Sequence, residues 1–167
     1  MLPFRLTDEF YLEVGKLTVG WAQVEIPLEF ITGILFMFAG GTKRLAKRLP
    51  RALDQKIQFC RGCLAELPQL GPFREGLTMI LDRVEELSEH RHRIVHGIVD
   101  NFTPVPLGMI IIRKLEYGNL EHRFTEHRTS LRYMRELRKD IVALGAATNK
   151  AAQALGQLAG VPPIQFD

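Results

Sequence analysis

The residues best suited to chemistry in this 167-residue chain lie in one short segment, "ELSEHRHRIVHG", from Glu86 to Gly97. It holds three of the five histidines of the chain, together with two arginines. Histidine is the side chain that exchanges protons near neutral pH, and arginine holds phosphate or carboxylate oxygens through a planar fork of N–H donors. The segment is therefore the first candidate for a functional site.

Helical phase divides this segment into two faces. At 100° per residue, Arg91 falls on an apolar stripe, whereas His92 and His96 fall on a polar stripe on the far side. Arginine is rarely buried without a partner, because desolvating an unpaired guanidinium is costly. We therefore expect Arg91 to lie at a groove or a dimer seam, or to pair with an acidic residue. Candidate acidic partners are Asp8, Glu9 and Glu13.

The polar stripe has two other interpretations. It is typical of a solvated face with Glu-to-His pairs, each worth a few tenths of a kcal/mol, and we favour this interpretation for Glu85. Glu89 and His92 also form the Glu-x-x-His pair that di-iron helix bundles use. Such a site needs two of these pairs and inward-pointing carboxylates, whereas the chain offers one pair that points outward. We therefore expect no metal and no other cofactor.

Apolar residues spaced by four and three predict the amphipathic helices that must position this segment. The first runs from Phe10 to the glycines at 40–41, with Thr7 as N-cap, and is bent or divided at Pro27. The predicted ranges of the other helices are 50–67, 73–98 and 129–158, the last of them capped by Thr129.

A change of period between residues 100 and 128 predicts a β-hairpin, because "MIIIRKLE" and "LEHRFTE" flank a "YGN" turn. The hairpin occupies residues 107–125. The sequence thus predicts one all-α domain over 1–167, an antiparallel bundle of four long helices with this small hairpin inserted between the third and fourth helices.

The stretch "RHRIVHG" resembles the Arg-(polar)-x-x-x-His signature of the HEPN superfamily of small all-helical proteins. Arg91 matches the arginine, His92 the polar position and His96 the histidine. The resemblance implies a metal-independent endoribonuclease, of the toxin or defence type, that works as a homodimer and can have an antitoxin partner. Some members carry a tyrosine, the site of adenylylation, two residues after the histidine, where this chain has Ile98.

The chemistry implied is RNA cleavage by the 2′-hydroxyl of the RNA itself, which needs a base, an acid and a cation on the phosphoryl oxygens. His96 would serve as base or acid, Arg91 would hold the phosphate, and His92 would position or polarise. Arg91 and His96 point about 140° apart on an ideal helix. Either the helix unwinds toward Gly97, or Arg91 and His96 from two protomers combine across a two-fold axis.

A non-catalytic nucleotide- or protein-binding module is the alternative, since fold does not fix function. The presence of both Arg91 and His96 favours catalysis. A run of cations in "TKRLAKRLPR" is a candidate contact for the RNA backbone, although a solvated surface would have the same composition. The cations concerned are Lys43, Arg44, Lys47 and Arg48.

Bulk composition favours an ordinary globular protein, with 46% hydrophobic residues, 25% charged residues and a net charge of +3. The most apolar stretch, "FITGILFMFAG" from Phe30, is shorter than the roughly 20 residues of a membrane-spanning helix. We therefore expect a cytoplasmic protein without a membrane partner. Cys60 and Cys63 offer only half of a zinc site, and we expect them to pack as small apolar residues.

Overall fold

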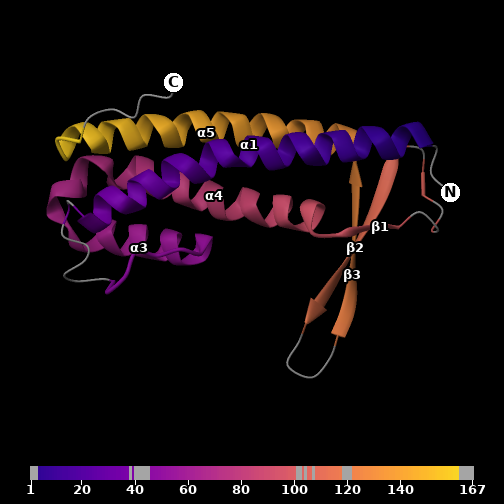
Figure 1. Cartoon of the computed structure of the whole chain (residues 1–167), viewed down its shortest axis with the longest axis horizontal. Helices are drawn as coiled ribbons and strands as arrows, with labels where there is room; N and C mark the ends of the chain where they lie inside the picture. Colours follow the sequence, from indigo (N-terminus) through magenta and orange to yellow (C-terminus); the bar gives the residue numbers. More distant parts are fainter. Residues whose placement is uncertain are drawn as a thin grey trace. The chain divides into compact units, whose positions relative to one another are not determined.

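The computed structural model describes residues 4–37, 39, 46–100, 103, 105–106, 108–117 and 122–161, and within them the chain is mainly α-helical, as predicted (Figure 1). The helices are α1 (Phe4–Met37), α3 (Leu53–Glu66), the 3₁₀ helix η1 (Pro68–Phe73), α4 (Arg74–Val95) and α5 (Leu131–Leu158). The strands are β1 (Ile98–Asp100), β2 (Met109–Tyr117) and β3 (His122–Ser130).

The chain divides into two compact units. Unit 1 comprises Met1–Gly20 and Leu87–Ile141, and unit 2 comprises Trp21–Glu86 and Val142–Asp167. The helices α1, α4 and α5 each contribute residues to both units. The three motif residues at the end of α4 belong to unit 1, together with the whole sheet.

Apolar stripes that the spacing of four and three predicted form most of the core of unit 2, and Leu81 of α4 adds to them. Burying one large aliphatic side chain contributes about 1.5–3 kcal/mol, so these stripes hold the helices of this unit together. Cys60 and Cys63 are buried among them as predicted, and the Cys60 sulfur lies 3.7 Å from Oγ1 of Thr32. Core residues of unit 2 are Trp21, Val24, Leu28, Ile31, Leu35, Ile57, Cys60, Cys63, Leu64, Leu77, Leu81, Val84, Leu144 and Leu155.

Pro27 lies inside α1 without ending it, so the helix is not divided there. Proline lacks an N–H, which leaves the carbonyl four residues earlier, that of Gln23, without its intrahelical donor. Gly145 of α5 lies against this carbonyl: a Cβ at position 145 would stand 3.1 Å from the Gln23 oxygen. The glycine therefore allows α5 to approach the backbone of α1 closely at the carbonyl that Pro27 leaves unpaired.

The sheet of unit 1 is antiparallel, in the order β1-β2-β3. The predicted hairpin is present as β2 and β3, and each strand is nine residues long. Ile110, Ile111 and Ile112 in β2 are all buried, which anchors the base of the hairpin on both faces.

The helical stripe that includes Ile98 is wrong at its last member, because α4 ends at Val95 and Ile98 begins β1, whereas the interpretation of Gly97 as a helix-ending residue agrees with the structure. Gly97 explains the change. A Cβ at this position would clash with Cγ2 of Ile112 and stand 2.8 Å from the carbonyl oxygen of Arg93. The bare glycine lets β2 pass against the end of the helix, and Val99 then pairs with Ile112.

Other helix ends also differ from the predictions. Helix α1 begins at Phe4, so Thr7 lies inside it, and α3 begins at Leu53 rather than near Pro50. Helix α5 begins at Leu131, where the Oγ of Ser130 accepts a hydrogen bond of 3.2 Å from the N–H of Tyr133. Ser130, rather than Thr129, is therefore the capping residue.

Helix α1 includes a segment, Asp8–Met37, that is long and apolar enough by length and composition to cross a membrane. This segment is longer than the apolar stretch that the sequence analysis singled out. The core helix of a soluble protein passes the same test, and 44% of the most apolar part of this segment is buried inside the structure. One such helix is weak evidence, and the cytoplasmic location stays a prediction.

Candidate functional site

The two motif histidines lie side by side at the end of α4. His96 follows the last helical residue, and its backbone N–H still donates a 3.1 Å hydrogen bond to the carbonyl of His92. The two imidazole rings have centroids 4.6 Å apart and are tilted by 49°. Both residues are exposed. The end of the helix therefore keeps His96 beside His92, in a pair that a substrate can reach from solvent.

Arg91 is half-buried, and its Nε is shielded from solvent without a hydrogen-bond partner among the described residues. Two of the acidic partners considered for it pair with other cations. Glu9 lies 3.4 Å from Arg135, and the buried Glu13 pairs with Lys16 at 3.0 Å and with Arg138 at 3.4 Å. Asp8 forms no ion pair with Arg91 in the part of the chain that the structure describes.

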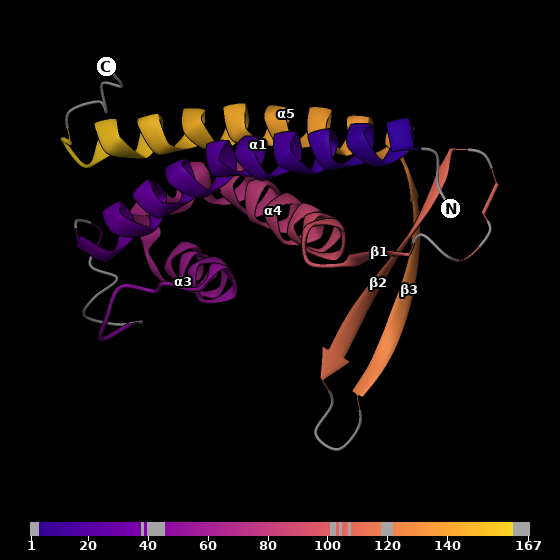
Figure 2. The same cartoon turned by 45° about the vertical axis from the view of Figure 1, so that its right-hand side comes forward.

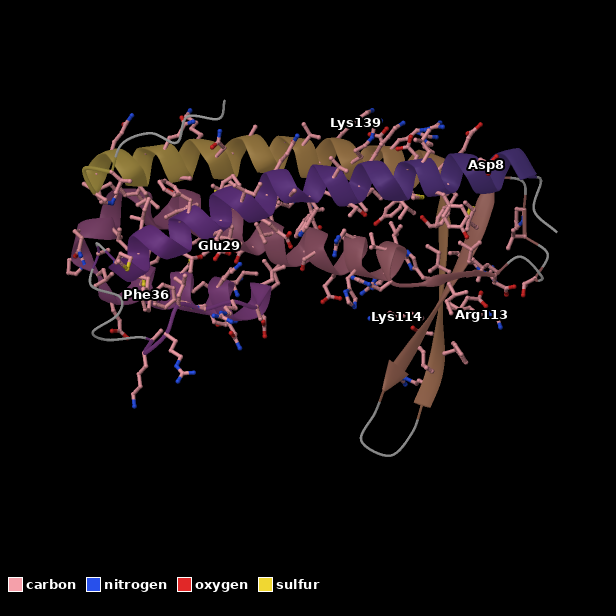
Figure 3. The ribbon with its side chains drawn as sticks, viewed as in Figure 1. Asp8, Glu29, Phe36, Arg113, Lys114 and Lys139 are labelled. Carbon is pink, nitrogen blue, oxygen red and sulfur yellow. The ribbon has the colours of Figure 1, made fainter. Side chains whose placement is uncertain are left out.

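The register of the sheet places Lys114 on the face of β2 that lies against the end of α4. Paired residues on neighbouring strands, and every second residue along a strand, share one face. Ile112, which packs against Gly97, therefore shares its face with Lys114 on β2 and with Thr125 and His127 on β3. Figure 3 shows Lys114 on the side of the strand nearer the end of α4 and Arg113 on the opposite side.

Arg113 has a different role from its neighbour. It lies on the opposite face of β2 and forms an ion pair of 2.9 Å with Asp100 of β1. The Asp100 carboxylate also accepts hydrogen bonds from the backbone N–H and the hydroxyl of Thr103. Arg113 therefore ties β1 to β2, and Lys114 is the cation of β2 that belongs to the histidine site.

Partial desolvation and nearby positive charge both favour the neutral form of His92. Burial lowers the pKa of His92, and the charges of Lys114, His96 and Arg91 lower it further, while Glu89 opposes them. A neutral imidazole has a free ring nitrogen that accepts a proton, which is the form a general base needs at neutral pH.

A second group of residues holds the end of α4 in place. Nδ1 of His90 and the hydroxyl of Tyr133 lie 2.8 Å apart, and their rings meet edge to face. Burial lowers the pKa of His127, as do the charges of Arg93 and His90. Tyr133 of α5 thus contacts α4 at His90, two residues before His92.

The four cations proposed for the RNA backbone lie elsewhere in the chain. Lys47 and Arg48 are exposed and belong to unit 2, whereas the motif belongs to unit 1. Lys43 and Arg44 lie outside the described residues. Within the residues that the structure describes, no three His, Cys, Asp or Glu side chains gather closely enough to hold a metal ion.

The sequence pattern did not identify three residues of this site: Lys114, His127 and Tyr133. The contribution of Lys114 and His127 depends on the register between β2 and β3, which the run of three isoleucines in "MIIIRKLE" conceals, whereas Tyr133 lies on α5. Strict alternation of polar and apolar residues would have shown which face is buried, but both faces of β2 are apolar at this point.

Comparison of the chain with protein-family models, with curated proteins and with solved structures gives no match. The resemblance to the HEPN superfamily therefore depends on the motif residues.

Proposed function

We propose that the end of α4 is the active site of a metal-independent endoribonuclease. The observation that supports this most strongly is the exposed pair of imidazole rings, 4.6 Å apart, beside the charges of Lys114 and Arg91. Proton acceptors and donors next to cations are what RNA cleavage by the 2′-hydroxyl requires.

Each residue then has a defined role. The neutral ring of His92 removes the proton of the 2′-hydroxyl, and the 2′-oxygen attacks the neighbouring phosphorus. The bond from phosphorus to the 5′-oxygen breaks, and the protonated ring of His96 gives its proton to that oxygen. Arg91 and Lys114 bind the phosphoryl oxygens as negative charge accumulates on them. The products are a 2′,3′-cyclic phosphate and a 5′-hydroxyl.

The test is incubation of the purified protein with structured and unstructured RNA in excess chelator. Wild type is compared with Arg91→Ala and His96→Ala, and with Arg132→Ala as a control that removes an exposed charge of unit 1. We expect cleavage that survives chelation, is lost in the first two variants and leaves 2′,3′-cyclic phosphate ends. No cleavage, or equal cleavage by all four proteins, would favour a nucleotide- or protein-binding module instead.

A homodimer with both motifs at one cleft is part of the proposal. It is supported by the position of Arg91, which has no ion pair with a described carboxylate and points about 140° away from His96 on an ideal helix. In a dimer, Arg91 of one protomer reaches the phosphate held by the histidines of its partner. We further propose that the helices form an antiparallel four-helix bundle, and that the protein is a toxin or defence protein that works in the cytoplasm with an antitoxin partner.

Subunit mixing tests the composite site. Arg91→Ala and His96→Ala protomers, unfolded and refolded together, would form mixed dimers in which one of the two sites keeps both functional residues. We expect activity to return in the mixture, although each variant alone is inactive. A mixture that forms dimers but stays inactive would assign both residues to sites within one chain.

A further inference from the structure

Unit 2 contains a hollow that the proposed ribonuclease site does not use. It is lined by the C-terminal end of α1, the residues that precede α3 and one face of α3. Figures 1 and 2 both show α3 beside this end of α1. The hollow has a volume of about 1020 Å³, at the upper end of the roughly 300–1,000 Å³ of small-molecule pockets. It therefore has room for a small molecule.

Two aromatic rings line this hollow. Phe36 of α1 is half-buried, so part of its side chain is accessible to a ligand, and Phe59 of α3 is buried. Their ring centroids lie 6.1 Å apart, and the rings are tilted by 56°. This contact holds the two rings in place. An aromatic wall of this kind favours a ligand that presents the flat face of a ring.

Two arginines from the segment before α3 line the same hollow. Arg48 and Arg51 are exposed, and neither forms an ion pair or a side-chain hydrogen bond with another described residue. The planar fork of a guanidinium binds phosphate or carboxylate oxygens through parallel hydrogen bonds. A phosphate monoester has three terminal oxygens, so it can accept hydrogen bonds from both arginines at once. The pair therefore favours a phosphate group.

Negative charge is scarce around the hollow. No Asp or Glu lines it among the described residues, and Lys56 of α3 pairs with Glu29 of α1. Asp54, which is exposed, lies in the first turn of α3. Even with Asp54 counted, the two arginines leave a net positive charge at this end of α3, and such a charge attracts an anion.

Two glutamines complete the wall that α3 contributes. Gln55 and Gln58 are exposed and lie on the same face of α3 as Phe59. A glutamine amide carries both donors and an acceptor, and it pairs with adjacent polar atoms at the edge of a nucleobase. Because an alkyl chain has no polar atoms for these amides, the wall favours a polar ring over a lipid tail.

We propose that this hollow binds a nucleoside monophosphate. The phosphate lies against Arg48 and Arg51, the base packs against Phe36, and Gln55 and Gln58 bind the polar edge of the base. The site is separate from the proposed ribonuclease site, because its residues all belong to unit 2 whereas the motif histidines belong to unit 1. The inference therefore does not depend on the proposed function, and it gives Arg48 a small ligand rather than the RNA backbone.

The test is isothermal titration calorimetry of the purified full chain with each of the four ribonucleoside monophosphates. Wild type is compared with the double variant Arg48→Gln/Arg51→Gln and with Phe36→Leu, which removes the ring but keeps an apolar side chain. The matched control is Lys47→Gln, which removes an exposed cation of the same segment that does not line the hollow. Inorganic phosphate and the parent nucleosides are titrated into the wild type, because each has only one half of the recognised chemistry.

We expect at least one monophosphate to bind the wild type about tenfold more tightly than inorganic phosphate or its own nucleoside does. The double variant should bind it at least about tenfold more weakly, and Phe36→Leu about three- to fivefold more weakly. Lys47→Gln should bind like wild type. Absence of binding, equal affinity of wild type and the double variant, or equal affinity for inorganic phosphate would overturn the inference.

His92→Ala separates this site from the end of α4, where a nucleotide would also bind as a fragment of RNA. Binding that is unchanged in His92→Ala and lost in the double variant would assign the ligand to the hollow, even if the protein cleaves no RNA. Binding that is lost in His92→Ala and kept in the double variant would assign it to the histidine site and overturn the inference, even if RNA is cleaved.

Discussion

His92 of unit 1 and the two cysteines of unit 2 experience the same physical effect with opposite chemical results. Burial is the largest cause of the lowered pKa of His92. It is also the largest cause of the raised pKa of Cys60, to about 11, and of Cys63, to about 12. In both cases burial favours the neutral form. Neutral imidazole is the reactive base at neutral pH, whereas a neutral thiol is a poor nucleophile.

The comparison shows why closely spaced reactive residues are not sufficient evidence for a site. Cys60 and Cys63 lie three apart on α3, and His92 and His96 four apart at the end of α4. The thiols lie inside a core, and the rings are exposed beside cations. Accessibility and neighbouring charge, more than spacing, distinguish the two pairs.

The largest expected effect comes from removing the base. His92→Ala should lower the rate of RNA cleavage by about 10²- to 10⁴-fold, the usual contribution of a positioned general base. Cys63→Ala serves as the control from unit 2 and should cleave at the wild-type rate. Its rate is measured at a temperature below its melting transition, so that the sample is folded. A His92→Ala protein that cleaves at the wild-type rate would remove His92 from the mechanism.

Thiol labelling measures the other half of the comparison. With pKa values of about 11 and 12, the two thiols hold more than about 100-fold less thiolate at neutral pH than an ordinary cysteine. Iodoacetamide should therefore label the native protein at least that much more slowly than the denatured protein, as followed by mass spectrometry. Rapid native labelling would contradict the assignment of both cysteines to the core.

Gly97→Ala tests the contact that brings β2 to the histidines. The added methyl group would clash with Ile112, and overpacking of this kind destabilises by about 1–3 kcal/mol. Gly76 lies in α4 with open space at its Cβ position, so Gly76→Ala should instead stabilise by about 0.5–1 kcal/mol. Urea denaturation compares the two variants, and equal stability would indicate that β2 does not need the close approach.

The smallest expected effect is a pH dependence of stability from His127. Its pKa is lowered in the folded protein by burial and by Arg93 and His90, so the unfolded chain takes up the proton first as pH falls below about 6.5. Stability should therefore decline between pH 7 and pH 5. His127→Gln should make this decline shallower, whereas Cys63→Ala should leave it unchanged because thiols stay neutral in this range. Denaturation curves at a series of pH values decide between these outcomes.

Periodic apolar spacing was sufficient to predict the mainly helical class, the buried stripes of α1 and α3, and the position of the hairpin. It failed at the end of α4, where Ile94 and Ile98 fit one helical stripe but Ile98 forms a strand. A local apolar pattern around Ile94 and Ile98 cannot show that Gly97 lies against Ile112, which is fifteen positions further along the chain. The same limitation hid Lys114 and His127, whose roles depend on strand register.

The close approach of Gly145 to Gln23 also limits how this sequence can change over evolutionary time. A side chain at 145 would crowd both the carbonyl oxygen and the Cβ of Gln23, each 3.1 Å from the added Cβ. Replacing Pro27 would return a donor to that carbonyl but would leave this crowding in place. Lineages should therefore keep Gly145 whether or not they keep Pro27.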